Sequence, residues 1–244
     1  LEEHGIGLNV GVGLVPLVPA AVLFDLHVGD GRIRPDAAAG YAACQAASRQ
    51  RPEEGNVGAG AGATVGKLFG PEFSMKCGIA TAAVRVGQVT VGALIACNAV
   101  GDVIDPRTSA TVAGARMVDG KSLRDSTAAL LRGERPHPLI AGSNTTIGVI
   151  ATDARLTKAQ ARRLAVSSHD GLARAISPVH TMTDGDTLFT LATGMVDEFP
   201  GMVVLAAMAA EAVALATLRA ALTARAISTS NGLVLPAAHD LAQS

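Results

Sequence analysis

Residues 143–152 read SNTTIGVIAT, a polar cluster that leads into a run of β-branched and apolar residues. Such alternation favours an extended strand, so we expect a strand from Thr145 to Thr152. Residues 157–176 follow with apolar positions at helical spacing, and Thr157 with Gln160 forms a capping box, which predicts a helix. Small-residue strands between long Ala-rich helices indicate an α/β or α+β layered fold.

Further strands and helices are expected on both sides of this stretch. Residues 78–86 and 89–97 read as two strands joined by a hairpin turn at Gly87-Gln88. Residues 10–26 are rich in Val, Leu and Gly and are expected to form a buried extended segment with a turn. The remaining predicted elements are an Ala-rich helix at 35–49, an exposed loop or processing region at 121–138, a short strand at 187–192 and a long buried helix at 202–227. No linker separates two compact halves, so we expect residues 1–244 to form a single domain.

The composition argues against nucleic-acid and membrane partners. The net charge is −1, and only 2% of the 244 residues are aromatic, so the chain has neither a basic patch nor stacking platforms for bases. The apolar stretch at 202–227 is mostly Ala and is interrupted by Glu211, Arg219 and Arg225. Because charges are costly at bilayer depth, we expect a buried helix there rather than a membrane span.

The cysteine pattern and the first residues of the sequence indicate in which cellular compartment the protein is found. Cys44, Cys77 and Cys97 are odd in number and form no CxxC pair, so we expect small buried side chains in a reducing, cytoplasmic environment. No His or acid lies at ligand spacing from them, which argues against a metal site. The sequence opens on Leu1 without a basic signal-peptide region, and we expect it to begin partway through a longer gene product.

A glycine-rich loop, GAGAGATVGK, occupies residues 58–67. A phosphate-binding loop would need Gly at position 61 and a hydroxyl at position 68, whereas the chain has Ala61 and Leu68. No clear strand leads into a dinucleotide fingerprint, so we expect no nucleotide cofactor. For Lys67 the ordinary interpretation is a solvated surface lysine; the alternative is an ammonium presented where the backbone allows close approach.

Thr145 begins the predicted strand directly after Asn144. The ordinary interpretation is a turn before a buried strand. The functional one is that the Thr145 hydroxyl attacks the preceding carbonyl, and water then releases a new amino terminus. The released α-amine lies beside the hydroxyl and can take its proton, so nucleophile and base are one residue. An unperturbed α-amine titrates near ~8, close to the range that a general base needs.

Polar residues at other positions offer further candidates. Asp184 and Asp186 flank a glycine, which is typical of a turn but also gives a carboxylate pair that can bind an ammonium. Asn98 ends the apolar run 91–98, and its amide suits an oxyanion donor. A Ser/His/Asp triad around His169 and Asp170 is disfavoured, because adjacent helical residues point to different faces.

Together these residues resemble the L-aminopeptidase/D-amidase-esterase family, which includes β-peptidyl aminopeptidases and nylon-oligomer (6-aminohexanoate) hydrolases. The Asn144-Thr145 pair with its strand is the specific part of the match, whereas the glycine loop alone is not. The matching segments are 16–26, 34–36 with 40–42, 58–67, 91–98, 144–154 and 169–194. Some members use a tyrosine hydroxyl near the oxyanion where this chain has Phe24.

The resemblance implies an αββα sandwich of the N-terminal-nucleophile type, self-cleaved at Asn144/Thr145 into pieces 1–144 and 145–244. It implies Thr145 as nucleophile, Lys67 as polariser and Asn98 as oxyanion donor. Asp184 and Asp186 would hold the amine and orient the site. It further implies a tetramer of cleaved protomers. Nothing in the sequence requires a metal or cofactor, and we expect none.

Three functions remain open from the sequence. The first is an amidohydrolase or aminopeptidase acting on linear amides with a free amine: small peptides, amino-acid amides or ω-amino-acid oligomers. The second is an acyltransferase of the ornithine-acetyltransferase type, in which an amine instead of water accepts the acyl group from Thr145. The third is a non-catalytic scaffold of this fold. The joint presence of the five candidate site residues argues against the third.

Overall fold

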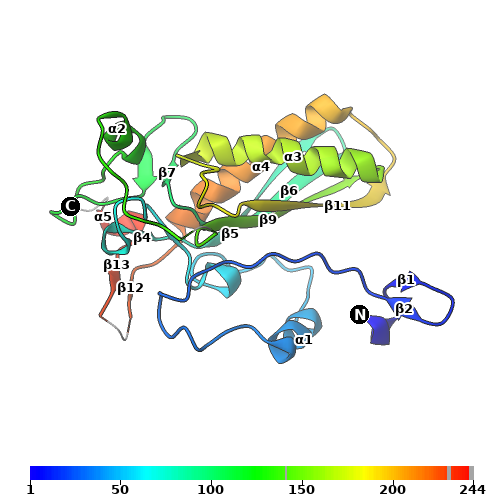
Figure 1. The fold of residues 1–244 in the computed structure, drawn as a ribbon. Helices are drawn as coiled ribbons and strands as arrows, with labels where there is room; N and C mark the ends of the chain where they lie inside the picture. The colour runs from blue at the N-terminus through cyan, green and yellow to red at the C-terminus, as the bar shows by residue number, and fades with distance from the viewer. Residues whose placement is uncertain (141, 230–231, 242–244) are drawn as a thin grey trace.

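A four-stranded sheet carries two long helices on one face in the computed structural model, which describes residues 1–140, 142–229 and 232–241 (Figure 1). The strand order is β11-β9-β6-β5, and the helices packed on the sheet are α3 and α4. β5 pairs antiparallel with β6 and β6 with β9, whereas β9 and β11 are parallel. Their bounds are β5 Ile79–Val86, β6 Val89–Asn98, β9 Thr145–Ala154, α3 Lys158–Ala175, β11 Thr187–Val196 and α4 Met202–Leu222. The parallel pair needs a crossover, and α3 supplies it.

The predicted hairpin and the predicted α3 are confirmed. The Thr157 side chain accepts the Gln160 N–H while the Gln160 side chain accepts the Thr157 N–H, so the capping box is complete. α3 buries Leu164, Ser168 and Leu172 against the core, as the spacing predicts. The helices α3 and α4 cross closely at Gly171, where a Cβ would lie 2.4 Å from the Ala210 carbonyl oxygen. Glycine is therefore required there by space.

By length and composition alone, α4 could cross a membrane, but core helices pass the same test, and half of the tested stretch is buried within the chain. Its buried face consists largely of alanines that lie against β5, β6 and α3. The helix ends at Leu222, five residues before the predicted end, where Thr223 caps it.

Smaller elements surround this core. They are β1 Leu8–Asn9, β2 Leu14–Val15, α1 Ala37–Gln45, β3 Thr64–Val65, β4 Met75–Lys76, β7 Asp102–Ile104, β8 Thr111–Ala113, α2 Ser126–Leu131, β10 Ile176–Ser177, β12 Ile227–Ser228, β13 Val234–Leu235, α5 Ala238–Leu241 and three 3-10 helices, Glu2–His4, Gly58–Gly60 and Pro71–Phe73. The 121–138 region, expected to be a loop, contains α2, because Asp125 accepts the Ala128 N–H and caps a helical turn. The strand predicted at 187–192 extends to Val196.

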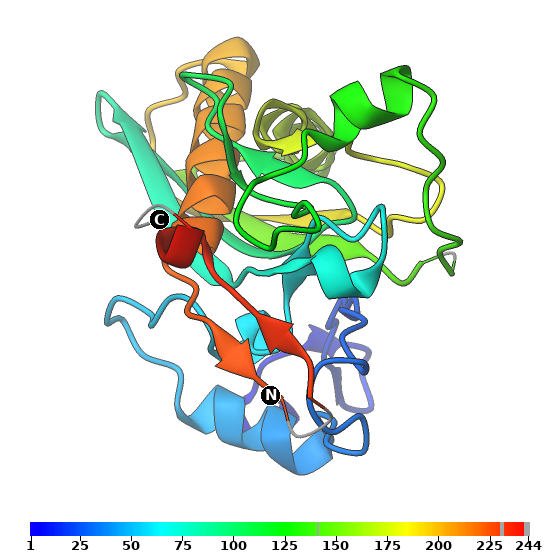
Figure 2. The ribbon, with the colours of Figure 1, turned by 90° about the vertical axis from the view of Figure 1, so that its left-hand side faces the viewer.

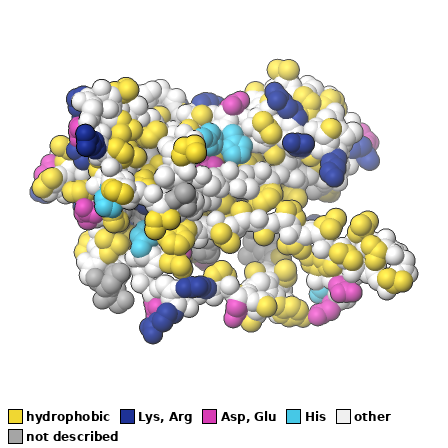
Figure 3. Space-filling view, in the orientation of Figure 1, with side chains coloured by type: hydrophobic (Ala, Val, Ile, Leu, Met, Phe, Trp, Pro, Cys, Tyr) yellow, Lys and Arg dark blue, Asp and Glu magenta, His cyan; other side chains and the backbone are white. Residues whose placement is uncertain are grey.

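The first 53 residues, here called the N-terminal arm, contain no buried residue. The arm lies on the side of the sheet opposite α3 and α4 in both ribbon views (Figures 1 and 2). Figure 3 shows hydrophobic side chains gathered on it, and Val12 and Val22 are 98% and 84% exposed. The prediction that residues 10–26 are buried is therefore wrong in this structure: apolar composition favours burial, but burial needs a packing partner. Cys44 on α1 is exposed for the same reason, whereas Cys77 and Cys97 are buried as expected.

The chain has the predicted α/β architecture. The described residues form one helical layer and one sheet of the expected αββα sandwich, and the arm crosses the remaining sheet face. Of the predicted pieces 1–144 and 145–244, residues 141, 230–231 and 242–244 lie outside the described part of the chain.

Candidate active site

Thr145 and Asn98 lie directly opposite each other where β9 and β6 meet. They are register partners in the antiparallel pair, which places their side chains on the same face of the sheet at neighbouring positions. Both are buried, at 4% and 0% exposure. The alternation of β9 directs Thr145 to the face opposite α3 and α4, whereas Thr146 faces the helices and Cys97. The structure thus brings together two residues that are 47 positions apart.

The Asn98 side chain is fixed at both ends. Its Oδ1 accepts bonds from the Thr64 N–H at 3.0 Å and from Lys67 Nζ at 2.8 Å. Its Nδ2 donates to the Phe24 carbonyl at 3.0 Å. Two donors converge on one end, so that end must be the oxygen. An amide nitrogen has two hydrogens, so the second Nδ2 hydrogen can donate to another acceptor.

Lys67 is buried beside Asn98, at 4% exposure, so its interpretation as a solvated surface lysine is wrong. Its Nζ donates to the Asn98 carbonyl at 2.9 Å as well as to Oδ1. Burial lowers the pKa of Lys67 to about 7, although the nearby Asp184 acts in the opposite direction. A neutral amine that donates two N–H bonds retains a free lone pair, so Lys67 can accept a proton near neutral pH.

The glycine loop positions Lys67 by close backbone packing. Gly66 has φ +73°, and a Cβ there would lie 2.0 Å from the Ala115 nitrogen. The Lys67 N–H donates to the Val100 carbonyl at 2.9 Å, which ties the loop to the end of β6. Thr64 and Val65 pair with β4 on the other side. Gly66 is therefore required for close contact with the main chain at residues 114–115.

Asp184 and Asp186 lie at the start of β11, next to β9. Asp186 Oδ1 accepts the Thr146 N–H at 2.7 Å, and its Oδ2 contacts His180 Nδ1 at 2.8 Å. Asp184 Oδ2 accepts the Thr181 N–H and hydroxyl at 2.9 and 2.7 Å. Burial raises the pKa of Asp184, an effect to which the charge of Asp186 adds. The Asp186 carboxylate thus binds the main chain next to Thr145, whereas the Asp184 carboxylate is bound by Thr181 and by the Val100 N–H at 3.4 Å.

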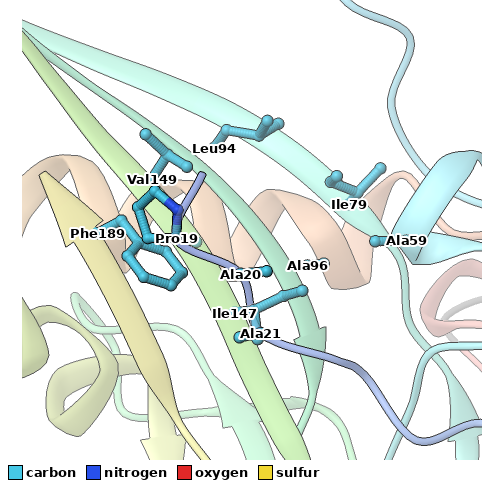
Figure 4. Close-up of a pocket in the computed structure, with 11 residues that line it drawn as sticks. Pro19, Ala20, Ala21, Ala59, Ile79, Leu94, Ala96, Ile147, Val149 and Phe189 are labelled. Atoms are coloured by element: carbon cyan, nitrogen blue, oxygen red, sulfur yellow. The ribbon is translucent and has the colours of Figure 1, made fainter. Parts of the chain in front are cut away.

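Two cavities lie near these residues. A polar cavity of about 420 Å³ is lined by residues 180–181 and 184–187. An apolar hollow of about 290 Å³ lies on the open face of the sheet, between β-strand side chains such as Ile147 and Phe189 and arm residues Pro19 to Ala21 (Figure 4). Among the described residues, no group of three or more His, Cys, Asp or Glu side chains could hold a metal ion.

Sequence reasoning missed Lys76 and the pairing of His180 with Asp186. Lys76 is fully buried, and its Nζ donates to the carbonyls of Gly60, Ala63 and Cys77. A lysine on a strand next to a buried cysteine gives no distinctive sequence signal. His180 lies six positions before Asp186 in the sequence, and the turn between them brings the two side chains into contact.

The disfavoured Ser/His/Asp triad does not form. The Ser168 hydroxyl donates to the Leu164 carbonyl at 2.7 Å inside α3, so it is held by its own helix. The His169 ring instead stacks at a tilt against the His180 ring, with 4.9 Å between centroids.

Comparison with known proteins gives a family and a fold. The model of Peptidase family S58 matches residues 6–235. An uncharacterized aminopeptidase of Mycobacterium leprae is 44% identical, over 81% of this chain and 55% of the relative. A 6-aminohexanoate-oligomer endohydrolase of Paenarthrobacter ureafaciens is 31% identical, over 78% of this chain and 53% of the relative. The chain therefore spans just over half the length of these two curated relatives.

Solved structures agree on the fold. A Burkholderia sp. beta-aminopeptidase superposes with a TM-score of 0.58 at 25% identity, over 85% of this chain and 57% of that one. The L-aminopeptidase D-ala-esterase/amidase of Ochrobactrum anthropi, a variant of the N-terminal-nucleophile hydrolase fold, superposes with a TM-score of 0.59 at 22% identity, over 84% and 55%. At that identity, the second match supports the fold alone.

Proposed function

The chain belongs to peptidase family S58, and on that premise we propose that it is a self-processing amidohydrolase with Thr145 as its nucleophile. Its substrates would be linear amides with a free amine: small peptides, amino-acid amides or ω-amino-acid oligomers. The names of two relatives, an aminopeptidase and an oligomer endohydrolase, support this class.

The observation that carries the proposal is the convergence of separate polar groups on Thr145. Asn98 lies opposite Thr145, Lys67 is bound to Asn98, and Asp186 holds the next amide along the strand. These residues come from three different parts of the chain. Burying an amine and carboxylates together is costly, so an arrangement of this kind is typical of a site that uses them.

Self-cleavage would begin with attack of the Thr145 Oγ on the Asn144 carbonyl carbon. No free α-amine exists at Thr145 in the intact chain, so another base is needed. We assign this role to the neutral Lys67 amine, whose pKa of about 7 leaves a substantial uncharged fraction near neutral pH. The proton moves from Oγ to the Thr145 nitrogen as the C–N bond breaks. Water then hydrolyses the ester and leaves an Asn144 carboxylate and a free Thr145 amine.

Turnover would use the same hydroxyl. The new α-amine takes the Oγ proton, Oγ attacks the substrate carbonyl, and the free Asn98 amide hydrogen stabilises the oxyanion. The departing amine takes the proton, and water releases the acyl group. Asp186 accepts the Thr146 N–H, one residue away from the released amine, and in this proposal it holds that amine in place. This scheme uses no metal or cofactor.

The direct test is the denatured intact mass of the wild type and of Thr145→Ala and Thr145→Ser variants. We expect two wild-type pieces, the smaller beginning at Thr145, and a folded, uncleaved and inactive Thr145→Ala chain. Loss of a nucleophile removes on the order of 10⁴-fold or more of activity. The serine variant keeps a hydroxyl and should retain part of it. Cleavage at 144/145 in the alanine variant would remove Thr145 from the mechanism.

A further inference from the structure

The carbonyl of the bond proposed for cleavage already has a hydrogen-bond donor. The Asn144 oxygen accepts the Gly185 N–H at 2.7 Å. Asn144 is buried, at 1% exposure, and forms a parallel bridge with Asp184. This contact joins the chain just before β9 to the turn just before β11, which are 41 positions apart.

Gly185 also lies against the hydroxyl of Thr145. A Cβ on Gly185 would be 2.9 Å from Thr145 Oγ1 and 3.8 Å from the Asn144 oxygen. Gly185 is not among the glycines with positive φ. Its backbone conformation therefore gives no reason for glycine, and the space beside Oγ1 does. The nucleophile and the carbonyl oxygen thus both face the same residue.

We propose that Gly185 is a catalytic residue of self-cleavage: its N–H stabilises the oxyanion that forms on Asn144, and its missing Cβ leaves room for the attacking Oγ. This inference rests on the self-cleavage proposed above. Attack forms the Oγ–C bond and moves the carbonyl π electrons onto the Asn144 oxygen. The C–N bond then breaks, and the nitrogen receives the Oγ proton. The Gly185 N–H already donates to the carbonyl oxygen of the intact bond at 2.7 Å, and this hydrogen bond strengthens as negative charge develops on that oxygen.

The flanking carboxylates hold this donor in position. Asp184 is bound on one side by the Thr181 N–H and hydroxyl, and its own N–H donates to the Thr181 carbonyl at 3.1 Å. Asp186 is bound on the other side by the Thr146 N–H. The turn that contains Gly185 is therefore fixed both to itself and to β9. Preorganisation of this kind makes a backbone donor effective, because no reorganisation is needed when charge develops.

Two different donors would then serve two reactions. The Gly185 N–H binds the Asn144 carbonyl, which is joined to Thr145 by an amide bond only in the intact chain. The Asn98 amide lies beside Thr145 on the neighbouring strand β6, and we assign it to the substrate carbonyl that binds once the Asn144–Thr145 bond is broken. The motif Asp184-Gly185-Asp186 gains a specific role, because its central residue acts through its backbone.

The test compares Gly185→Ala with a matched glycine substitution, Gly92→Ala. Gly92 lies in β6, where a Cβ would meet only the Ala82 oxygen at 3.8 Å, an ordinary contact. The rate of cleavage at 144/145 is followed by intact mass, and folding by thermal unfolding. Alanine keeps the backbone N–H but adds a Cβ 2.9 Å from Thr145 Oγ1, so we expect Gly185→Ala to cleave at least about 100-fold more slowly, the scale of misplacing a nucleophile. Gly92→Ala should cleave at the wild-type rate.

A second measurement addresses the donor without changing Gly185. In the uncleaved Thr145→Ala chain, amide hydrogen exchange at Gly185 should be slow, because its N–H is bound to Asn144. Rapid exchange there, or a folded Gly185→Ala chain that cleaves as fast as the wild type, would overturn the inference. If Gly185→Ala does not fold, the exchange measurement decides alone. Failure of the wild type itself to cleave would instead count against the proposed function.

Discussion

Two buried lysines near the short β3–β4 pair have different surroundings. Lys67 follows β3, and its Nζ reaches both oxygens of Asn98 at the edge of the site. Lys76 ends β4, and within the described part of the chain its Nζ donates to main-chain carbonyls only, those of Gly60, Ala63 and Cys77. Burial lowers the pKa of both, to about 7 for Lys67 and about 8 for Lys76. Burial and a lowered pKa therefore do not identify a catalytic lysine; its partners do.

The two lysines are expected to have different roles because their amines bind different partners. Lys67 binds a side chain that also faces Thr145, so a change in its protonation reaches the site. Lys76 instead joins the glycine loop, at Gly60 and Ala63, to the residue that follows β4, Cys77. We expect substitutions of Lys67 to affect chemistry and those of Lys76 to affect stability.

The largest effect is expected for Lys67→Met. Removing the proposed base should slow self-cleavage by about 10²–10⁴-fold, the usual contribution of a general base. The lost hydrogen bonds cost about 1 kcal/mol each, and relief of the buried charge offsets them. Intact-mass time courses measure the cleavage rate, and urea unfolding at pH 7 measures the free energy of unfolding. If this variant cleaved at the wild-type rate, Lys67 would not be the base, and the proposed difference in role between Lys67 and Lys76 would be wrong.

The pH dependence of cleavage sharpens the same distinction. If the neutral Lys67 amine is the base, the cleavage rate should rise about tenfold per pH unit below the Lys67 pKa of about 7 and level off above it. The residual cleavage of Lys67→Met should lack this step, whereas Lys76→Met should keep it. A wild-type rate that falls as the pH rises through 7 would assign the active form to the ammonium instead.

Lys76→Met should change stability in a pH-dependent way. The folded pKa of about 8 lies below the unfolded value of 10.5, so the unfolded chain binds more protons between these values. Wild-type stability from this group therefore rises from pH 8 to pH 10.5. Leaving the Cys77 carbonyl without its Lys76 donor should cost about 1–3 kcal/mol at pH 10 and less at pH 7. Denaturant midpoints at both pH values test this, and a cost that shrinks with rising pH would contradict it.

The smallest effect is expected for Lys158→Met, the control for both. Lys158 is an exposed residue at the first position of α3. Its loss should change the free energy of unfolding by no more than about 0.5 kcal/mol and leave cleavage unaltered. A slower cleavage rate here would mean that lysine substitutions act through net charge, and the comparison would lose its basis.

Local signals predicted the local elements well. The capping box of Thr157 and Gln160 and the hairpin at Gly87 depend on neighbours within a few positions, and both are present. The segment 10–26 was predicted to be buried and is exposed, because apolar content does not supply a packing partner. The helix α2 was missed because its six residues carry too little periodicity to be distinguished from a polar loop.

The sequence by itself determined the strand at Thr145, the helix after it and, through resemblance, the candidate residues Lys67, Asn98, Asp184 and Asp186. Only the tertiary structure decided which of them touch. It showed that Asn98 lies opposite Thr145, that Lys67 is buried, and that Gly185 contacts Asn144. The physical reason is that helix caps and alternation are short-range, whereas strand register and close backbone contacts join residues tens of positions apart.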